Sequence, residues 1–465
     1  MRLRDETRTT GRRVDKTSPS GGTALVLRKS QSPPTPDFSL YSILSPPSAE
    51  TQAVNFCFAS TKACNVSIEA GSRYLELLPT MYARAGKSSA LRPAAEALSL
   101  SLMWKAKRRS DMASAAHAHH CQALQALAGA IGDPVEAYSD ETIMTIMLLQ
   151  MYEALVGSDS GRAIRNHVQG AVLIAMQRGQ SSFQSEQSMR IFRAVRAILI
   201  QHNTYASISV SELTGNFDWF GDEEAYLVNP YNRFTRLSRI SAQVNELRAS
   251  SKKLFDTGSR RNVPPEEVDA LSREALNLLK ILQAWYDELP STYRYQTVVS
   301  FDKEQHDPNK VRPWRGITHV YEGLWEGNQV CTWASQRIYI AGVLLRCRCW
   351  TKYGTSTGPL DFLTRVEGYE IIQDAVDRIC AALPWFFGDL TANQSSQGVD
   401  DVAGRSVVFI TGPLWVAYVT EGISEQQREF MRGCLVALGE RFGLDTARLI
   451  VKTPPSLIFQ WTPFP

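Results

Sequence analysis

Three features that would assign a protein to a class at first sight are missing from this sequence: a strong net charge, closely spaced cysteine pairs and a long apolar run. The formal charge is only +3 over 465 residues, so no global electric field marks the chain as a nucleic-acid binder. The longest nearly apolar run, Val407 to Thr420, is shorter than the roughly 20 residues that a membrane-spanning helix needs, and Gly412-Pro413 interrupts it. We therefore expect no membrane span, and we expect any basic surface to be local.

The cysteines are scattered along the chain and most of them stand inside apolar, helix-like runs: Cys57, Cys64, Cys121, Cys331, Cys347, Cys349, Cys380 and Cys434. Such spacing forms no disulfide framework, which favours reduced thiols in a cytosolic or nuclear compartment. Residues 1–16 carry Arg and Asp where a secretory signal peptide needs an apolar stretch, so we do not expect secretion.

Known catalytic motifs are missing as well. The sequence contains no GxxxxGK[ST] loop, no GxGxxG after a strand, no GxSxG elbow and no HExxH helix, each of which places chemistry in a fixed geometry. We predict that the protein is not an enzyme, has no catalytic residues and needs no cofactor; any residues that bind a ligand are unknown at this stage.

The amino-acid composition changes near residue 50. Residues 1–50 are rich in Ser, Thr, Pro and charge and have few large apolar residues, which is typical of a disordered tail. The basic residues of this tail suit either a solvated segment or a weak nuclear-import or phosphate-contacting arm. Residues 51–465 are predicted to form one all-helical domain.

Helical periods dominate the chain after this tail. Residues 124–131 place apolar side chains on one face, and Gly132-Asp133-Pro134 ends that segment, because proline cannot continue a helix. Ser139-Asp140-Glu141 caps a following helix that is too apolar to be exposed. The next predicted helix, over residues 162–178, ends at Gly179 in the position of a C-cap. We predict an all-α fold, an irregular array of antiparallel helix pairs.

Further helices are expected over residues 187–200, 234–255, 265–289, 316–350, 364–383, 405–418 and 425–442. Strand-like alternation is scarce and no fixed-period repeat is visible, so a regular solenoid is not supported. Residues 298–313 and 388–404 are polar and are predicted to be loops.

A short histidine run, His117-Ala118-His119-His120-Cys121, comes nearest to a metal site. On a helix, His117 has both His120 and Cys121 as neighbours on one face, so these three side chains are spaced to meet at one ion. The alternative is that Cys121 packs inward while the imidazoles lie at the helix surface. Because no second pair of ligands accompanies the run, we predict no metal site. Cys347 and Cys349 point about 200° apart on a helix and are not expected to share an ion.

Two other clusters allow a functional and a structural interpretation. Lys105, Lys107, Arg108 and Arg109 could contact phosphates or direct nuclear import, but cations also favour the C-terminal end of the helix that begins near Pro93. Helix termination is the simpler account. Aromatic residues concentrate in the C-terminal third, where they form either the wall of an apolar effector pocket or part of the core: Trp314, Trp325, Trp333, Trp350, Trp385, Phe386, Phe387 and Trp415.

Several segments together resemble the regulatory domain of fungal zinc-cluster transcription factors over residues 51–451. The segments are Ala94 to Leu102, Leu148 to Glu153, His167-Val168-Gln169-Gly170-Ala171 with Arg178-Gly179 after it, and Leu383 to Gly388. Family members often have Trp where this chain has Ile164. The six-cysteine zinc cluster that precedes such a domain has no counterpart here.

The resemblance implies a helical domain that regulates transcription in the nucleus through dimerisation, effector binding or contacts with the transcription machinery. Family members frequently control secondary-metabolite or nutrient-use genes. We expect His167, Gly170 and Ala171 to serve packing, with the imidazole near Glu153 and the small residues admitting a neighbouring helix.

Two functional hypotheses follow. The first is a nuclear transcription regulator that touches DNA only weakly or through a DNA-binding partner, as a homo- or heterodimer; its zinc cluster has been lost, lies upstream in the gene or comes from the partner. The alternative is a helical module that senses a small apolar metabolite and acts through protein partners alone. Neither hypothesis includes a membrane.

Overall fold

The computed structural model describes residues 47–62, 74–107, 109–156, 160–220, 233–256, 263–299, 310–353, 365–389 and 399–452. The described residues from Ser48 onwards form one compact unit. The predicted disordered tail lies almost entirely outside the described residues, so its state and the domain boundary at residue 50 stay predictions. No helix within the described residues is both long and apolar enough to cross a membrane.

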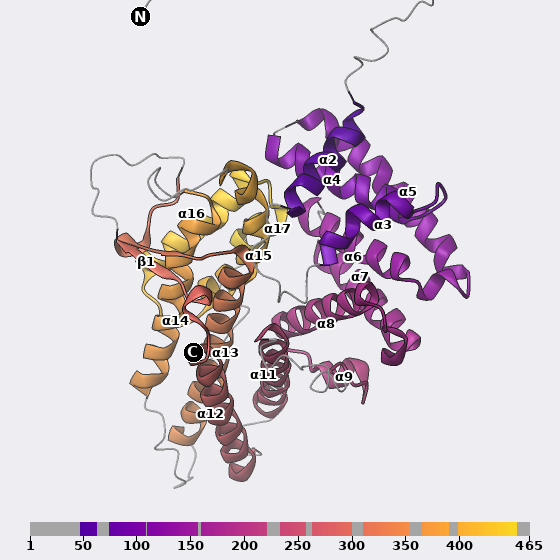
Figure 1. The fold of residues 1–465 in the computed structure, drawn as a ribbon. Helices are drawn as coiled ribbons and strands as arrows, with labels where there is room; N and C mark the ends of the chain where they lie inside the picture. The colour runs from indigo at the N-terminus through magenta and orange to yellow at the C-terminus, as the bar shows by residue number, and fades with distance from the viewer. Residues whose placement is uncertain are drawn as a thin grey trace, which may run out of the picture. The chain divides into compact units, whose positions relative to one another are not determined.

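The described part of the chain is helical apart from one small hairpin, which confirms the all-α prediction (Figure 1). The elements are α2 (Ala49–Lys62), α3 (Leu78–Arg84), α4 (Leu91–Lys107), α5 (Ala113–Gly132), α6 (Asp140–Val156), α7 (Ser160–Arg178), α8 (Glu186–Ala206), α9 (Val210–Thr214), α11 (Arg233–Asp256), α12 (Pro265–Asp287), β1 (Gln296–Val299), β2 (Ile317–Val320), α13 (Leu324–Tyr353), α14 (Arg365–Phe386), α15 (Val399–Val419), α16 (Glu425–Arg441) and α17 (Asp445–Lys452).

Consecutive helices pack against each other as antiparallel pairs. Extensive pairs are α4 with α5, α6 with α7, α11 with α12, α12 with α13, and α13 with α14. Their ends follow local chemistry. Ser139 Oγ accepts a hydrogen bond from the Thr142 backbone N–H at the start of α6, and α7 ends at Gly179, whose φ of 78° favours glycine. The predicted C-cap at Gly179 is confirmed.

Helix α6 lies at the centre of the N-terminal half. Its residues from Thr142 to Leu149 are all buried, and it packs against α4, α5, α7 and α8. A helix with apolar residues all around must be covered on every side, so the prediction of a central core helix is confirmed. One large hydrophobic cluster continues from Leu78 through this region to Ala447 near the end of the described chain.

Two contacts join the N-terminal helices to α17. The Lys105 ammonium at the end of α4 lies 3.2 Å from the Asp445 carboxylate, and the Thr446 hydroxyl donates a 2.8 Å hydrogen bond to the carbonyl of Ala154 in α6. These contacts hold the last described helix, α17, against α4 and α6, although the paired residues are about 300 positions apart in the sequence.

The sequence predictions were wrong around residues 296–323. A helix was expected from residue 316, but residues 317–320 form β2, which pairs antiparallel with β1, and α13 begins only at Leu324. Arg315 and Gly316 both have positive φ, which turns the chain into the strand. The predicted loop over 298–313 accordingly starts inside β1; residues 300–309 lie outside the described part.

Two smaller expectations also need correction. Gly412-Pro413 was expected to interrupt its apolar run, but α15 continues through Pro413, as α14 does through Pro384. The second predicted loop, over residues 388–404, is helical from residue 399 onwards, while residues 390–398 lie outside the described part. An internal proline removes one helical hydrogen bond, and here tertiary packing retains the helix despite that loss.

Candidate functional site

The histidine run lies on α5, and its side chains divide between the surface and the interior. His120 is buried with 6% of its surface exposed, whereas Cys121 and His117 are exposed. The alternative in which Cys121 packs inward and the imidazoles lie at the surface is therefore wrong for Cys121 and His120, whereas His117 is exposed as that alternative expects. Helical spacing explains the result, because Ala116, His120, Ala123 and Leu127 form the buried face and Cys121 falls about 100° away from His120.

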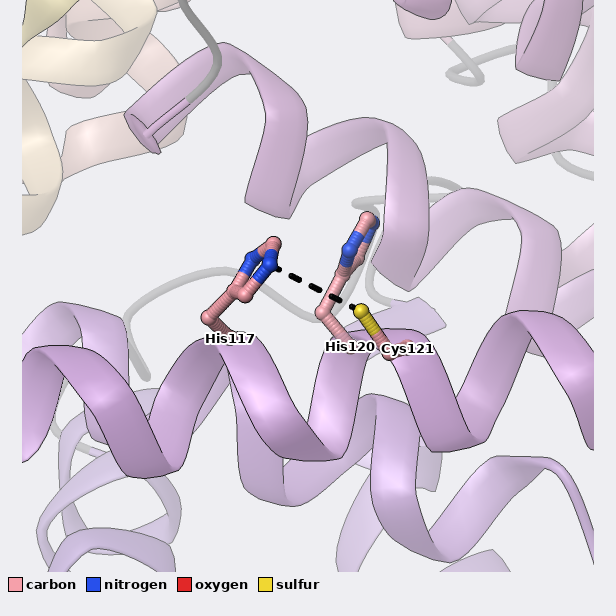
Figure 2. A group of neighbouring side chains, drawn as sticks. All are labelled: His117, His120 and Cys121. Carbon is pink, nitrogen blue, oxygen red and sulfur yellow. Dashed lines mark hydrogen bonds between the residues drawn. The ribbon is translucent and has the colours of Figure 1, made fainter.

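His117, His120 and Cys121 nevertheless project towards the same side of α5, as Figure 2 shows. Nε2 of His117 lies 3.7 Å from Sγ of Cys121, and the rings of His117 and His120 stack with 6.3 Å between their centroids. Each residue offers one ligand atom, and the three atoms lie within 4.8 Å of one another. We call these three residues the α5 triad.

Helix α6 supplies the surroundings of His120. Its ring stacks on Tyr152 with 4.2 Å between centroids and 15° between planes, and its Nε2 lies 3.1 Å from Oε1 of Glu153. The interaction with the His120 ring lowers the pKa of the Glu153 carboxyl, despite the opposing effect of burial. Tyr152 and Glu153 therefore hold the imidazole in one orientation beside a negative charge.

His119 points to a different set of carboxylates. Its Nδ1 lies 3.1 Å from Oε2 of Glu96 on α4, and its Nε2 lies 3.9 Å from Oε1 of Glu50 on α2. Tyr82 donates a 2.7 Å hydrogen bond to the other oxygen of Glu96. His119 thus links α5 to α2 and α4, and it takes no part in the α5 triad.

The His167 to Ala171 segment lies on α7, against α6. Ala171 is buried, as expected for a packing residue. His167 is half-buried, and burial lowers its pKa while the charge of Glu153 works in the opposite direction, which agrees with the predicted proximity to Glu153. The prediction for Gly170 is wrong, because a Cβ atom at this position would meet nothing within 4 Å. The residue therefore admits no neighbouring helix.

The basic cluster lies at the end of α4, which confirms the expectation that the helix terminates there. Lys105 pairs with Asp445 and lies 4.7 Å from the centre of the Trp104 ring. Arg109 forms a 2.7 Å ion pair with Asp111. Arg108 and the side chain of Lys107 lie outside the described part. The two described cations are thus engaged by carboxylates of the chain itself.

The two neighbouring cysteines of α13 differ in burial. Cys347 is buried and Cys349 is half-buried on one continuous helix, and burial raises the pKa of the Cys347 thiol to about 12. The Cys347 thiol is therefore protonated at neutral pH. That the two cysteines do not share an ion stays a prediction.

The aromatic residues of the C-terminal third are mainly core. Trp333, Phe386 and Phe387 are at most 1% exposed, and Nε1 of Trp333 donates a 3.0 Å hydrogen bond to the carbonyl of Leu282. Partly buried aromatic residues pack on the same core: Trp314, Trp350, Trp385 and Trp415. Trp325 stacks at an angle on Phe409.

Small cavities occur in both halves of the described chain. One is lined by residues of α6, α7 and α8, including His167 and Gln150, and another by Trp285, Tyr293 and Glu326 with their neighbours; each has a volume of about 10 Å³. This is room for about one water molecule, whereas sites for small organic ligands occupy roughly 300 Å³ or more. Neither cavity suits an apolar effector, and the effector stays a prediction.

Sequence reasoning missed the residues that surround the triad, Tyr152 and Glu153 above all. Glu153 was singled out in the sequence as a neighbour of His167, but nothing in the sequence indicated that it also lies beside His120. The comparisons with known proteins found no matching family model, no similar curated protein and no similar solved structure.

Proposed function

We propose that this protein is a nuclear regulator of transcription that acts through protein partners, as a homo- or heterodimer or by contacting the transcription machinery. A DNA-binding partner would bring it to its target genes. Its target genes would belong to secondary-metabolite or nutrient pathways, as is common in the fungal zinc-cluster family that it resembles.

The observation that carries the proposal is the placement of the segments that resemble the fungal regulatory domain. Leu148–Glu153 lies on α6 and His167–Ala171 on α7, and these two helices pack directly against each other. Ala94–Leu102 lies on α4, which packs on α6. Three of the four segments thus meet in one helical core, as parts of a common domain would.

The electrostatic pattern supports an indirect role on DNA. The net charge is near neutral, and Lys105 and Arg109, the described members of the densest basic cluster, pair with carboxylates of the chain. Phosphate contacts provide most of the affinity of proteins for DNA. Engaged cations contribute little to it, so a partner is the simpler source of DNA binding.

A tethering experiment tests the proposal. The full chain is fused to an unrelated DNA-binding domain in a fungal reporter strain that carries both an activated and a repressible promoter. We expect a several-fold change at one of the two promoters, and nuclear accumulation of the fluorescently tagged, unfused chain. No change at either promoter, or a tagged chain excluded from the nucleus, would refute the proposal.

A matched pair of variants assigns the effect to the folded part of the chain. Leu148→Asp places a charge at a fully buried position of α6, whereas Leu173→Asp changes a side chain of α7 that is 56% exposed. The reporter effect should disappear with the first variant and persist with the second. Full activity in Leu148→Asp would show that the helical domain is not the regulatory part.

A further inference from the structure

The α5 triad combines three donors that are chemically suited to one transition-metal ion. Two imidazole nitrogens and one thiolate sulfur form a ligand set that zinc accepts readily, because imidazole and thiolate are its usual protein ligands. The three come from His117, His120 and Cys121, within two turns of one helix. Carboxylates, which favour magnesium and calcium, are not among the three.

The spacing of the triad fits tetrahedral coordination. Zinc binds sulfur at about 2.3 Å and imidazole nitrogen at about 2.0–2.1 Å, and at a tetrahedral angle these lengths separate the two donors by about 3.6 Å. Nε2 of His117 and Sγ of Cys121 are 3.7 Å apart. All three ligand atoms lie within 4.8 Å of one another, and the exposed His117 and Cys121 side chains are the ones free to adjust towards His120.

The buried member of the triad is already oriented. Glu153 lies 3.1 Å from Nε2 of His120, and the Tyr152 ring stacks on the imidazole. Since Nε2 faces the carboxylate, Nδ1 is the ring nitrogen that we assign to the ion. A carboxylate behind a metal-binding histidine fixes its tautomer and makes it a stronger ligand. This support distinguishes the triad from three side chains that merely lie at a helix surface.

We propose that His117, His120 and Cys121 bind one zinc-class divalent ion, with Glu153 as the positioning residue for His120. The Cys121 thiol loses its proton to solvent on binding. Three protein ligands leave the fourth tetrahedral position open, and the exposure of His117 and Cys121 directs it outward, where a water molecule or a side chain of another protein can complete it. This metal site is a property separate from the proposed role in transcription, and the proposal of the site does not depend on that role.

Titration with Co²⁺ tests the site, because Co²⁺ takes the geometry of zinc and reports thiolate ligation by a sulfur-to-metal charge-transfer band. The purified, reduced full chain is stripped of metal with a chelator and titrated with Co²⁺, then with Zn²⁺. We expect the charge-transfer band to saturate at one Co²⁺ per chain and to disappear when one equivalent of Zn²⁺ displaces it.

Three variants assign the ligands. Cys121→Ser should remove the charge-transfer band, and His117→Ala should weaken Co²⁺ binding by at least about tenfold. Cys349→Ser, which changes a half-buried cysteine on α13, should leave the titration unchanged. Far-ultraviolet circular dichroism verifies that each variant is folded. A wild-type chain without the band, or a folded Cys121→Ser chain that retains it, would overturn the proposal.

Discussion

At the scale of single residues, burial decides the charge state of His319. His319 on β2 stacks on Tyr295 with 3.6 Å between ring centroids and is 7% exposed. Burial lowers its pKa from 6.5 to about 4; the positive charge of Arg378 acts in the same direction, and Asp374 opposes it. His319 is therefore neutral in the folded protein over the physiological pH range.

This neutral histidine should make the protein less stable in mild acid. The unfolded chain, with a pKa near 6.5, takes up a proton before the folded chain does, so the contribution of His319 is complete above pH 6.5 and is lost as the pH falls towards 4. Between pH 7 and pH 5 it should lower the free energy of unfolding by about 2 kcal/mol. In His319→Phe, which keeps the aromatic stacking, urea denaturation at the two pH values should show a pH dependence smaller by this amount. Equal pH dependence in both proteins would disprove the assignment.

At the scale of elements, two glycines of one helical segment have opposite roles. Gly170 lies inside α7 with open space around its Cα atom, and helical glycine is less stable than alanine. Gly179, directly after the helix, has φ 78° and ψ 142°, a conformation essentially restricted to glycine. Both positions are glycine, but only at Gly179 does the backbone conformation require one.

Substitution by alanine should separate these two roles. Gly170→Ala should raise the free energy of unfolding by about 0.5–1 kcal/mol, while Gly179→Ala should lower it by about 1–3 kcal/mol. Denaturant titrations of the two variants and the wild type provide the comparison. A destabilised Gly170→Ala would restore the idea that another helix approaches this position closely.

At the scale of the whole molecule, the near-neutral charge and the pairing of Lys105 with Asp445 predict weak contact with DNA. The purified full chain should bind duplex DNA without sequence preference and with an affinity that falls steeply as salt rises, because counterion release dominates such binding. Fluorescence anisotropy with two unrelated duplexes at low and physiological salt measures both properties. Nanomolar, sequence-selective binding at physiological salt would show that the chain contains its own DNA-recognition element.

Much of the helical architecture could be predicted, because its signals are local. The apolar composition of residues 143–149, the Gly132-Asp133-Pro134 stop and the cap at Gly179 act through neighbours in the sequence, so periodicity and turn chemistry sufficed to place α5, α6 and α7. The hairpin of β1 and β2 was missed because its strands have only four residues each. The pairing of these strands depends on partners about 20 positions away.

The candidate site divides in the same way. The sequence by itself determined that His117, His120 and Cys121 would be close, since helical spacing brings residues three and four apart together. Only the tertiary structure decided which of them is buried, because α6 covers one face of α5 and brings Tyr152 and Glu153 to His120. The same holds for Lys105 and Asp445, which are 340 positions apart. Local spacing fixes the directions in which side chains leave a helix, whereas burial and charge partners depend on helices that arrive from elsewhere in the chain.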